Sequence, residues 1–223
     1  MSKIDSPLYN DNRNYDYSSA FREEREEYKL ICEMTEPNSR VIDLACGNGS
    51  LLEKLIKEKN IKGEGVELSS SGVEACKKKG LKVIQGRIDE KLPFDDNTFD
   101  YSICNVTIQM VMYPEILLSE MKRISKYQIV SFPNFGHYKN RLDLLLKGRM
   151  PKPMLFGYKW YSTGHIHQLS IKDFYELLND VGELKALKVK NLMGANPIKR
   201  FIAMYLPNLF VPETIFFLTA SND

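Results

Sequence analysis

The chain has 223 residues, of which 43% are hydrophobic and 27% are charged, and its formal net charge at pH 7 is +2. These values are typical of one large soluble globular domain, and so small a net charge argues against a nucleic-acid partner or a membrane surface. No apolar stretch of the sequence approaches the roughly 18 residues that a membrane-spanning helix needs.

The four cysteines, Cys32, Cys46, Cys76 and Cys104, show no C-x-x-C spacing and no pattern of metal ligands. The first residues, from Met1 to Asp5, lack the apolar region of a secretion signal. We therefore expect reduced thiols that pack in the interior, no bound metal and a cytoplasmic location.

The N-terminal segment, residues 1–34, precedes the first predicted strand. Residues 1–17 are polar and carry three tyrosines, and a charged helical pattern runs from Ser18 to about Met34. This pattern fits either a tail with a solvated helix or a lid that closes over a ligand. Residues 35–223 are expected to form a single domain with an insert at about 137–170.

From Val41 onward, short apolar runs alternate with segments of helical periodicity. The predicted strands are 41–44, 63–67, 82–85, 100–104, 128–132, about 185–190 and 214–219. The predicted helices are 50–58, 70–79, 115–125, 137–147 and 171–180. This alternation predicts an α/β fold, Rossmann-like and doubly wound, with a mostly parallel seven-stranded sheet and helices on both faces.

The stretch Arg40 to Ser50 predicts a buried strand that runs into a tight turn and then a helix. Gly47 and Gly49 in this turn can adopt a positive φ, and they lack a Cβ that would keep a ligand away from the backbone. The helix that begins at Ser50 offers unpaired N–H groups to an anionic group. This is the stretch of the chain whose spacing implies a ligand.

The turn lacks the signatures of phosphate ligands. A dinucleotide fingerprint requires glycines at 45, 47 and 50, and only Gly47 fits, while the lysine of a P-loop is missing because the first lysine after the turn is Lys54. A ligand with a carboxylate, an amino group and a positive centre suits an uncharged turn with Asp43 at its root. S-adenosylmethionine is such a ligand, and the alternative is a turn that merely packs.

An acid on the next strand strengthens this hypothesis. Glu67 ends the predicted strand 63–67 and lies 20 residues after Gly47, about the separation at which βαβ nucleotide sites place an acid on the ribose hydroxyls. A carboxylate accepts two hydrogen bonds at once, as a vicinal diol requires. We expect a carboxylate that waits for its ligand, so that its removal leaves the stability of the fold almost unchanged.

Ligands of doubly wound sheets lie at the carboxyl ends of the strands, near the switch point of the strand order. This rule adds further candidates for cofactor contacts: Cys46, Leu68, Ile88, Asp89 and Asn105. Leu68 and Ile88 either sandwich an adenine ring or belong to the core. Asp89 either accepts a hydrogen bond from the adenine amino group or is a solvated loop acid.

Several motifs occur in order along the chain. They are the turn from Asp43 to Gly49, Val83 to Gly86, Thr107 to Gln109, Val130 to His137, Gly148 to Pro151, Trp160-Tyr161, Ile166-His167 and Pro207 to Phe210. In these motifs the chain resembles the class I S-adenosylmethionine-dependent methyltransferases, and within them the methionine biosynthesis protein family MetW. The resemblance runs from about Arg25 to Thr219, and its most family-specific segment is Phe132 to His137.

The chain departs from the family pattern at two positions. Ala45 replaces the first glycine of the turn, which a tight turn tolerates if φ stays negative there. Arg87 stands where the family commonly carries Asp, so Asp89 is the nearest replacement as an acceptor for the adenine amino group. With these departures, the resemblance implies the cofactor-binding residues Asp43, Ala45, Cys46, Gly47, Gly49, Glu67, Leu68, Ile88, Asp89 and Asn105.

The resemblance implies methyl transfer from S-adenosylmethionine to a small molecule, linked to methionine biosynthesis. An O or N nucleophile also needs a base, and a histidine is the usual one. His167 is our first choice because it keeps the motif position, and Tyr161 is the second. A structural role for His167, as a hydrogen-bonding residue of the insert, is an equal alternative.

A second hypothesis belongs to another functional class. Proteins of the MetW type are associated with homoserine O-acyltransferase, so the chain resembles a binder of S-adenosylmethionine that acts as a partner or activator of that enzyme. Residues 146–167 concentrate aromatic, Met and Arg residues of the kind enriched at interfaces, although they fit a substrate pocket equally. Prolines and glycines interrupt this stretch, so we expect a surface or cleft rim there and no strand of the sheet.

Overall fold

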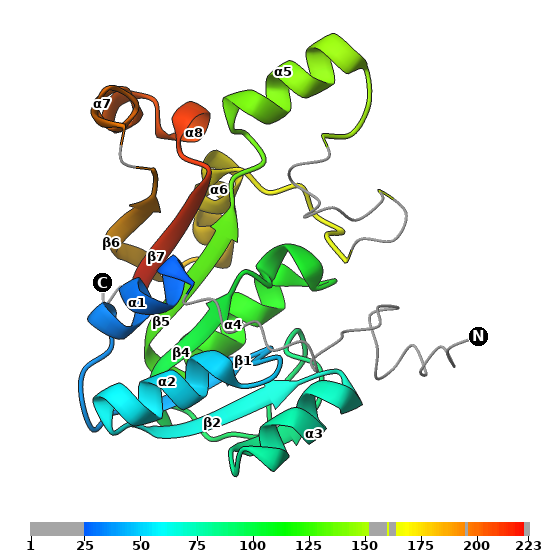
Figure 1. The fold of residues 1–223 in the computed structure, drawn as a ribbon. Helices are drawn as coiled ribbons and strands as arrows, with labels where there is room; N and C mark the ends of the chain where they lie inside the picture. Colours follow the sequence, from blue (N-terminus) through cyan, green and yellow to red (C-terminus); the bar gives the residue numbers. More distant parts are fainter. Residues whose placement is uncertain (1–24, 152–159, 161–163, 195, 221–223) are drawn as a thin grey trace.

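The computed structural model describes residues 25–151, 160, 164–194 and 196–220. Its described part is built around one seven-stranded sheet with the order β3-β2-β1-β4-β5-β7-β6 (Figure 1). The strands are β1 (Arg40–Leu44), β2 (Lys62–Glu67), β3 (Lys82–Gln85), β4 (Phe99–Asn105), β5 (Ser125–Pro133), β6 (Leu184–Leu192) and β7 (Glu213–Ala220). The helices are α1 (Glu26–Met34), α2 (Ser50–Lys59), α3 (Ser70–Lys78), η1 (Ile108–Met110), α4 (Pro114–Ile124), α5 (Tyr138–Lys147), α6 (Ile171–Val181), α7 (Pro197–Tyr205) and α8 (Pro207–Phe210).

The first five strands of the sheet run parallel, and β7 runs antiparallel to both β5 and β6. Each predicted strand agrees with an observed one to within three residues at either end. The predicted fold class is therefore confirmed. The strand order reverses between β1 and β4, so the turn after β1 lies at the switch point, where doubly wound sheets bind their ligands.

Alternating side chains along the central strands form two hydrophobic cores, one on each face of the sheet. On one face, Ile42, Val130 and Phe216 lie in a core with apolar residues of α4 and α6. On the other face, Val41 and Ile129 lie in a core with apolar residues of α1 and α2. This two-sided burial is what a period-two pattern of apolar residues predicts for strands between two helical layers.

Three side chains mark the starts of helices in the way that the sequence rules describe. Ser69 accepts a hydrogen bond from Gly72 N at the start of α3. Ser170 and Asp173 form a reciprocal capping box at the start of α6. These caps fix where each helix leaves the carboxyl edge of the sheet.

The helices α7 and α8 are not among those predicted from the sequence. The start signals of α7 are present, since Asn196 accepts hydrogen bonds from Ile198 N and Lys199 N and Pro197 lies in the first turn. Of the residues of α7, only Ala203 is buried, so no broad core-facing stripe reveals the helix. α5, α7 and α8 gather beyond the end of the sheet at which β5 finishes (Figure 1).

Two expectations from the sequence extend beyond the described residues. Residues 1–24 lie outside them, so the lid hypothesis for 1–34 stays a prediction. Residues 152–159 and 161–163 also lie outside them, and the described residues of 146–167 include no strand. Within the described ranges, no helix has both the length and the apolarity that crossing a bilayer requires.

Candidate functional site

The turn between β1 and α2 is held in a left-handed backbone conformation at three of its five residues. Ala45, Gly47 and Gly49 have φ values of 64°, 57° and 72°. Ala45 N and Cys46 N both donate to Val66 O of β2, at 2.8 and 3.1 Å, and Gly49 N donates to Cys46 O at 2.8 Å. These bonds tie the turn to the neighbouring strand, so its shape is fixed by the sheet.

The condition under which the turn was expected to tolerate Ala45, a negative φ, is not met. The φ of 64° places this alanine in the left-handed region, which costs an L-residue with a Cβ roughly 1 to 2 kcal/mol. The two hydrogen bonds to Val66 O show why the turn keeps this conformation, because a negative φ would redirect the backbone N–H groups. The substitution thus stores strain in the turn.

Replacing Ala45 with glycine is expected to raise the free energy of unfolding by about 0.5 to 1 kcal/mol, because the relieved strain exceeds the entropy that glycine adds to the unfolded chain. Urea unfolding measures the change. Ala75→Gly is the matched control, since Ala75 lies inside α3 and its replacement should lower the stability by about 1 kcal/mol. A loss of stability in Ala45→Gly would contradict the strain.

Glu67 braces the glycine turn from the end of β2. Its Oε2 accepts a hydrogen bond from Gly47 N at 2.8 Å, and its Oε1 accepts one from Ser69 N at 2.8 Å. The side chain is 5% exposed. The expectation of a carboxylate that waits for its ligand and contributes little to the free protein does not fit these contacts, because both of its oxygens accept backbone hydrogen bonds.

Asp43 lies beneath the turn and is 2% exposed. Burial, followed by the negative charge of Glu67, raises the pKa of its carboxyl group to about 7. Among the described residues, neither a lysine nor an arginine forms an ion pair with Asp43. Two buried carboxyl groups thus lie at the root of one turn, where a nearby positive charge would favour their ionised forms.

The free energy of unfolding is expected to fall as pH rises from about 4 to 7, because the pKa of Asp43 is higher in the folded state than its ordinary value of 3.8. The contribution of Asp43 to stability is present in full at pH values below its ordinary pKa. It is lost as the pH rises through the folded-state pKa. Asp43→Asn removes this loss, so the variant should exceed the wild type by roughly 1 to 3 kcal/mol at pH 8 and match it near pH 4. Urea titrations at several pH values measure the difference.

Two further groups bear on this comparison. Burial raises the pKa of Glu213 to about 7 as well, but Glu213 is present in both proteins and its contribution cancels in the difference. Asp95→Asn is the matched control for the change from aspartate to asparagine, because Asp95 is exposed. If the difference in the free energy of unfolding between Asp43→Asn and the wild type did not change with pH, the pKa of Asp43 would not be raised in the folded state.

The back of the turn is filled by α3. Cys46 Sγ lies 3.8 Å from Cys76 Sγ, and Cys76 Sγ lies 3.3 Å from Gly47 O. A Cβ on Gly49 would come within 2.9 Å of Cys76 Sγ, so only glycine fits between the turn and this helix. All four cysteines of the chain are buried, as expected of packing residues.

Asp89 is buried and its Oδ2 is already engaged. It accepts hydrogen bonds from Met112 N at 2.8 Å and Tyr113 N at 3.2 Å, and it forms an ion pair with Arg87 at 2.7 Å. Asp89 therefore holds the loop after β3 against the segment before α4. The alternative that Asp89 is a solvated loop acid is wrong, because the side chain is buried and bonded. Its contact with adenine stays a prediction.

Leu68 and Ile88 differ in their surroundings. Leu68 is half-buried, and its carbonyl oxygen accepts a hydrogen bond from Gln85 Nε2 at 3.0 Å. Ile88 is 5% exposed and packs in the core with Ile42 and Val66. Of the two residues, only Leu68 has substantial surface for a ring to contact.

The loop after β4 is strained and carries a polar atom without a partner. Val106 has a φ of 53°, a rare conformation for a β-branched residue. Asn105 Oδ1 accepts from Ser131 Oγ at 2.6 Å, which fixes the end of β4 to β5. Gln109 is 3% exposed, and its Oε1 is buried and has no hydrogen-bond partner among the residues that the structure describes. Gln109 belongs to a motif that is visible in the sequence, but no site role was predicted for it.

The three histidines occupy different places. His167 is exposed, its backbone N donates to Gln109 O at 3.0 Å, and its Nε2 lies 3.4 Å from Met112 O. His137 begins α5, and its Nδ1 accepts from Lys139 N at 3.4 Å. His165 is buried. The structure thus brings His167 to the loop after β4, whereas Tyr161 lies outside the described residues.

The family-specific segment after β5 has a structural role. Asn134 Nδ2 donates to Asn208 O at 3.0 Å and to Val211 O at 2.7 Å, while its Oδ1 accepts from Gly136 N at 2.9 Å. Asn140 Nδ2 donates to Phe135 O at 3.2 Å. These side chains fasten the loop after β5 to α5 and to the segment from α8 to Val211.

Comparisons with known proteins agree with this geometry. The family model of the methionine biosynthesis protein MetW matches residues 25–218. The bifunctional methionine biosynthesis protein MetXA/MetW of Rhodopirellula baltica is 35% identical over 161 residues, which are 68% of this chain and 26% of that protein. The chain thus spans about a quarter of the length of that relative.

Two further likenesses concern methyltransferases. The demethylmenaquinone methyltransferase of Staphylococcus aureus is 32% identical over 178 residues, covering 70% of this chain and 72% of that protein. The solved structure of an S-adenosylmethionine-dependent methyltransferase from Mesorhizobium loti superposes with a TM-score of 0.62, over 88% of this chain and 98% of that one. Its identity is 13%, so this likeness shows the fold alone.

Proposed function

The chain belongs to the MetW family of methionine biosynthesis proteins and has the class I methyltransferase fold, and from this premise we propose that it binds S-adenosylmethionine and methylates a small molecule. The observation that carries the proposal is the left-handed turn after β1, which lies at the switch point and has two buried carboxyl groups beside it. Uncharged backbone donors next to buried negative charge suit a ligand with a carboxylate, an amino group and a positive sulfur.

The residues present fit such a cofactor. Asp43 is a buried carboxyl group with no ion-pair partner in the described chain, and its raised pKa shows that a nearby positive charge would stabilise it. The cofactor residues in this proposal are Asp43, Ala45, Cys46, Gly47, Gly49, Glu67, Leu68, Ile88, Asp89 and Asn105. Among them, Glu67 serves the ribose hydroxyls and Leu68 the adenine ring.

S-adenosylmethionine supplies a methyl group on a sulfonium centre, which an O, N, S or C nucleophile attacks. The chain aligns the nucleophile and excludes water, and these two effects carry most of the rate of such a transfer. His167 would take the proton of an O or N nucleophile. Its Nε2–H donates to Met112 O, so Nδ1 is the nitrogen that can accept a proton.

Calorimetric titration with S-adenosylmethionine and S-adenosylhomocysteine tests the binding half of the proposal. Saturable binding of both ligands is expected, and the absence of binding would end the cofactor hypothesis. Release of S-adenosylhomocysteine in the presence of cell extract tests the transfer half, because this product forms whatever the methyl acceptor is.

A second function is supported by exposed apolar side chains on two helices. On α5 they are Leu142, Leu144, Leu145 and Leu146, and on α7 they are Ile198, Phe201, Met204 and Tyr205. Leu145 and Leu146 are 78% and 77% exposed, which is unusual for neighbouring leucines of a soluble protein. Together with the joint name MetXA/MetW of the relative, this favours a partner or activator of homoserine O-acyltransferase that binds S-adenosylmethionine without using it.

Affinity purification of the tagged protein from its own cell extract, read by mass spectrometry, separates the two functions. Capture of an acyltransferase without release of S-adenosylhomocysteine would support the regulator, and release without capture would support the enzyme. Leu145→Lys is the informative variant, since it should abolish capture and leave cofactor binding unchanged. Its control is Lys54→Gln, on the far helix α2.

A further inference from the structure

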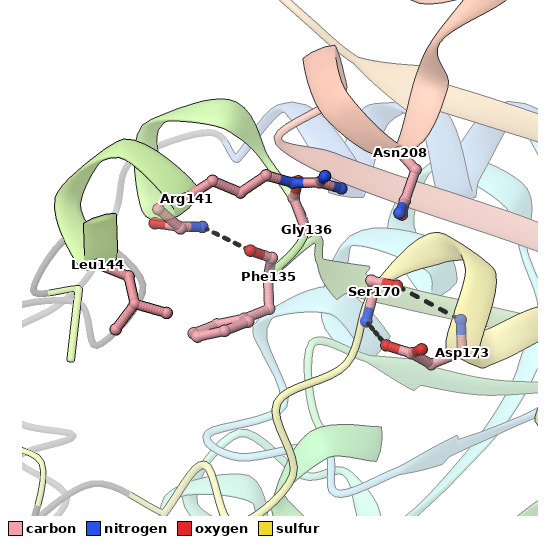
Figure 2. A pocket seen from close by; sticks show the side chains of 8 residues that line it. Phe135, Gly136, Arg141, Leu144, Ser170, Asp173 and Asn208 are labelled. Atoms are coloured by element: carbon pink, nitrogen blue, oxygen red, sulfur yellow. Dashed lines mark hydrogen bonds between the residues drawn. The ribbon is translucent and has the colours of Figure 1, made fainter. Parts of the chain in front are cut away.

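A cavity of about 340 Å³ lies between α5, the start of α6 and α8 (Figure 2). Its lining residues are Phe135, Gly136, Asn140, Arg141, Leu144, Ser170, Asp173 and Asn208. None of them belongs to the turn that the cofactor proposal uses. The volume is near the lower end for ligand pockets, which is about 300 Å³, so the cavity suits a small molecule.

The wall of the cavity beside the end of β5 is already in place without a ligand. Phe135 O accepts a hydrogen bond from Asn140 Nδ2, and Gly136 N donates one to Asn134 Oδ1. A Cβ on Gly136 would lie 3.1 Å from both Asn134 Oδ1 and Asn208 Nδ2, so the wall is tightly packed. Because the backbone of this wall is already ordered, little conformational entropy is lost there when a ligand binds.

One side of the cavity offers positive charge and N–H donors. Arg141 Nε donates to Gly136 O at 2.6 Å, which holds the guanidinium group above Gly136, close to Asn208 (Figure 2). Arg141 forms no ion pair with any carboxylate in the described ranges. Asn208 Oδ1 accepts from Lys172 N at 3.4 Å, so its Nδ2 is the donor that faces Gly136. A carboxylate fits these donors, because a guanidinium group can bind it through two parallel bonds.

The opposite side of the cavity carries negative charge. Asp173 Oδ2 accepts from Ser170 N at 2.9 Å, and no described lysine or arginine is paired with it. Its carboxylate already occupies the start of α6, where a helix attracts negative charge. A second anion is therefore disfavoured at this end, and an ammonium group is favoured.

We propose that this cavity binds a small α-amino acid. Its carboxylate pairs with Arg141 and Asn208, its ammonium group pairs with Asp173, and its side chain contacts Phe135 and Leu144. A ligand with only one of the two charges would satisfy only one side of the cavity. The inference goes beyond the proposed function, because it requires neither bound S-adenosylmethionine nor methyl transfer.

The probe is L-norleucine, titrated into the whole chain and followed by saturation-transfer NMR. Hexanoate is the same molecule without its amino group, and pentylamine is the same molecule without its carboxylate. We expect saturable binding of norleucine in the millimolar range, and at least about tenfold weaker binding of the other two compounds. Equal binding of hexanoate would overturn the proposal, and so would the absence of saturable norleucine binding.

Two variants assign the binding to this cavity. Arg141→Gln and Asp173→Asn should each weaken norleucine binding about tenfold or more, with thermal midpoints showing that both variants are folded. Arg149→Gln is the control, because Arg149 follows α5 and is exposed but does not line the cavity. Unchanged binding in Arg141→Gln would place norleucine elsewhere and overturn the assignment.

Titrations with and without S-adenosylhomocysteine separate this proposal from the cofactor proposal. Norleucine binding that persists with S-adenosylhomocysteine bound excludes the methionine portion of the cofactor site as its location. Norleucine binding by a protein that does not bind S-adenosylhomocysteine would support the cavity and end the proposed function. The reverse result would overturn the cavity and leave the proposed function standing.

Discussion

Replacing Glu67 with alanine is expected to weaken S-adenosylmethionine binding by roughly 2 to 4 kcal/mol, or about 30-fold to 1,000-fold. Each hydrogen bond from a ribose hydroxyl to the charged carboxylate contributes about 1.5 to 3 kcal/mol, and the two do not add fully because water enters the space of the missing side chain. A carboxylate oxygen can accept more than one hydrogen bond, so the bonds that Glu67 accepts from Gly47 N and Ser69 N are compatible with bonds from the ribose hydroxyls.

The same substitution is expected to lower the stability of the protein without ligand by about 1 to 3 kcal/mol, because it leaves the N–H groups of Gly47 and Ser69 without their acceptor. Calorimetry at a temperature well below the thermal midpoint measures the affinity of the folded protein. Glu64→Gln is the matched control, since Glu64 lies on the same strand and pairs with Lys82 at 2.6 Å. Equal affinities of wild type and Glu67→Ala would mean that the ribose is held elsewhere.

The sheet was predictable because its strands combine a clear apolar pattern with well-marked ends. Val41 and Ile42 face opposite cores, and the Gly47–Gly49 turn marks the change from strand to helix. The helices α2, α3, α4, α5 and α6 follow the same logic and agree with their predicted ranges. α7 was not predicted, and it buries only Ala203, but burial alone does not separate it from the predicted helices because α5 buries only Asn140.

The sequence indicated candidate site residues but not the bonds between them. The separation of Gly47 and Glu67 predicted an acid for the ribose hydroxyls, which stays a prediction, and the 2.8 Å hydrogen bond from Gly47 N to Glu67 Oε2 was not foreseen. The φ of Ala45 depends on two hydrogen bonds to Val66 O, a partner on another strand. The bonds of Asp89 to Met112 N and Tyr113 N span more than 20 positions of the sequence, which no local pattern reveals.

The cavity at α5 was also not predictable from the sequence, because it joins residues that are far apart along the chain. Arg141 and Asp173 lie on different helices, and no sequence pattern indicates that they share a cavity. The motif from Phe132 to His137 was visible in the sequence, but the hydrogen bonds by which Asn134 fixes the loop were not. Family-specific residues can therefore mark the frame of a site as well as its reactive groups.

Replacing His167 with alanine is expected to lower the rate of methyl transfer by roughly 10² to 10⁴, with cofactor affinity unchanged, as for loss of a general base. The exposed imidazole leaves Nδ1 able to accept a proton once Nε2–H is donated to Met112 O. The backbone bond from His167 N to Gln109 O survives the substitution, so the loop after β4 should keep its shape.

The comparison of kcat with cofactor affinity distinguishes this role from a structural one. Loss of a base lowers kcat and leaves the affinity for S-adenosylmethionine unchanged, whereas loss of a structural contact should affect both. Gln168→Ala is the control, because Gln168 is the exposed neighbour and its side chain bonds only to His165 O within the described chain, at 3.3 Å. If His167→Ala retained the rate, the imidazole would be a structural group that anchors the segment before α6 to Met112. The base would then have to come from another residue or from the acceptor itself.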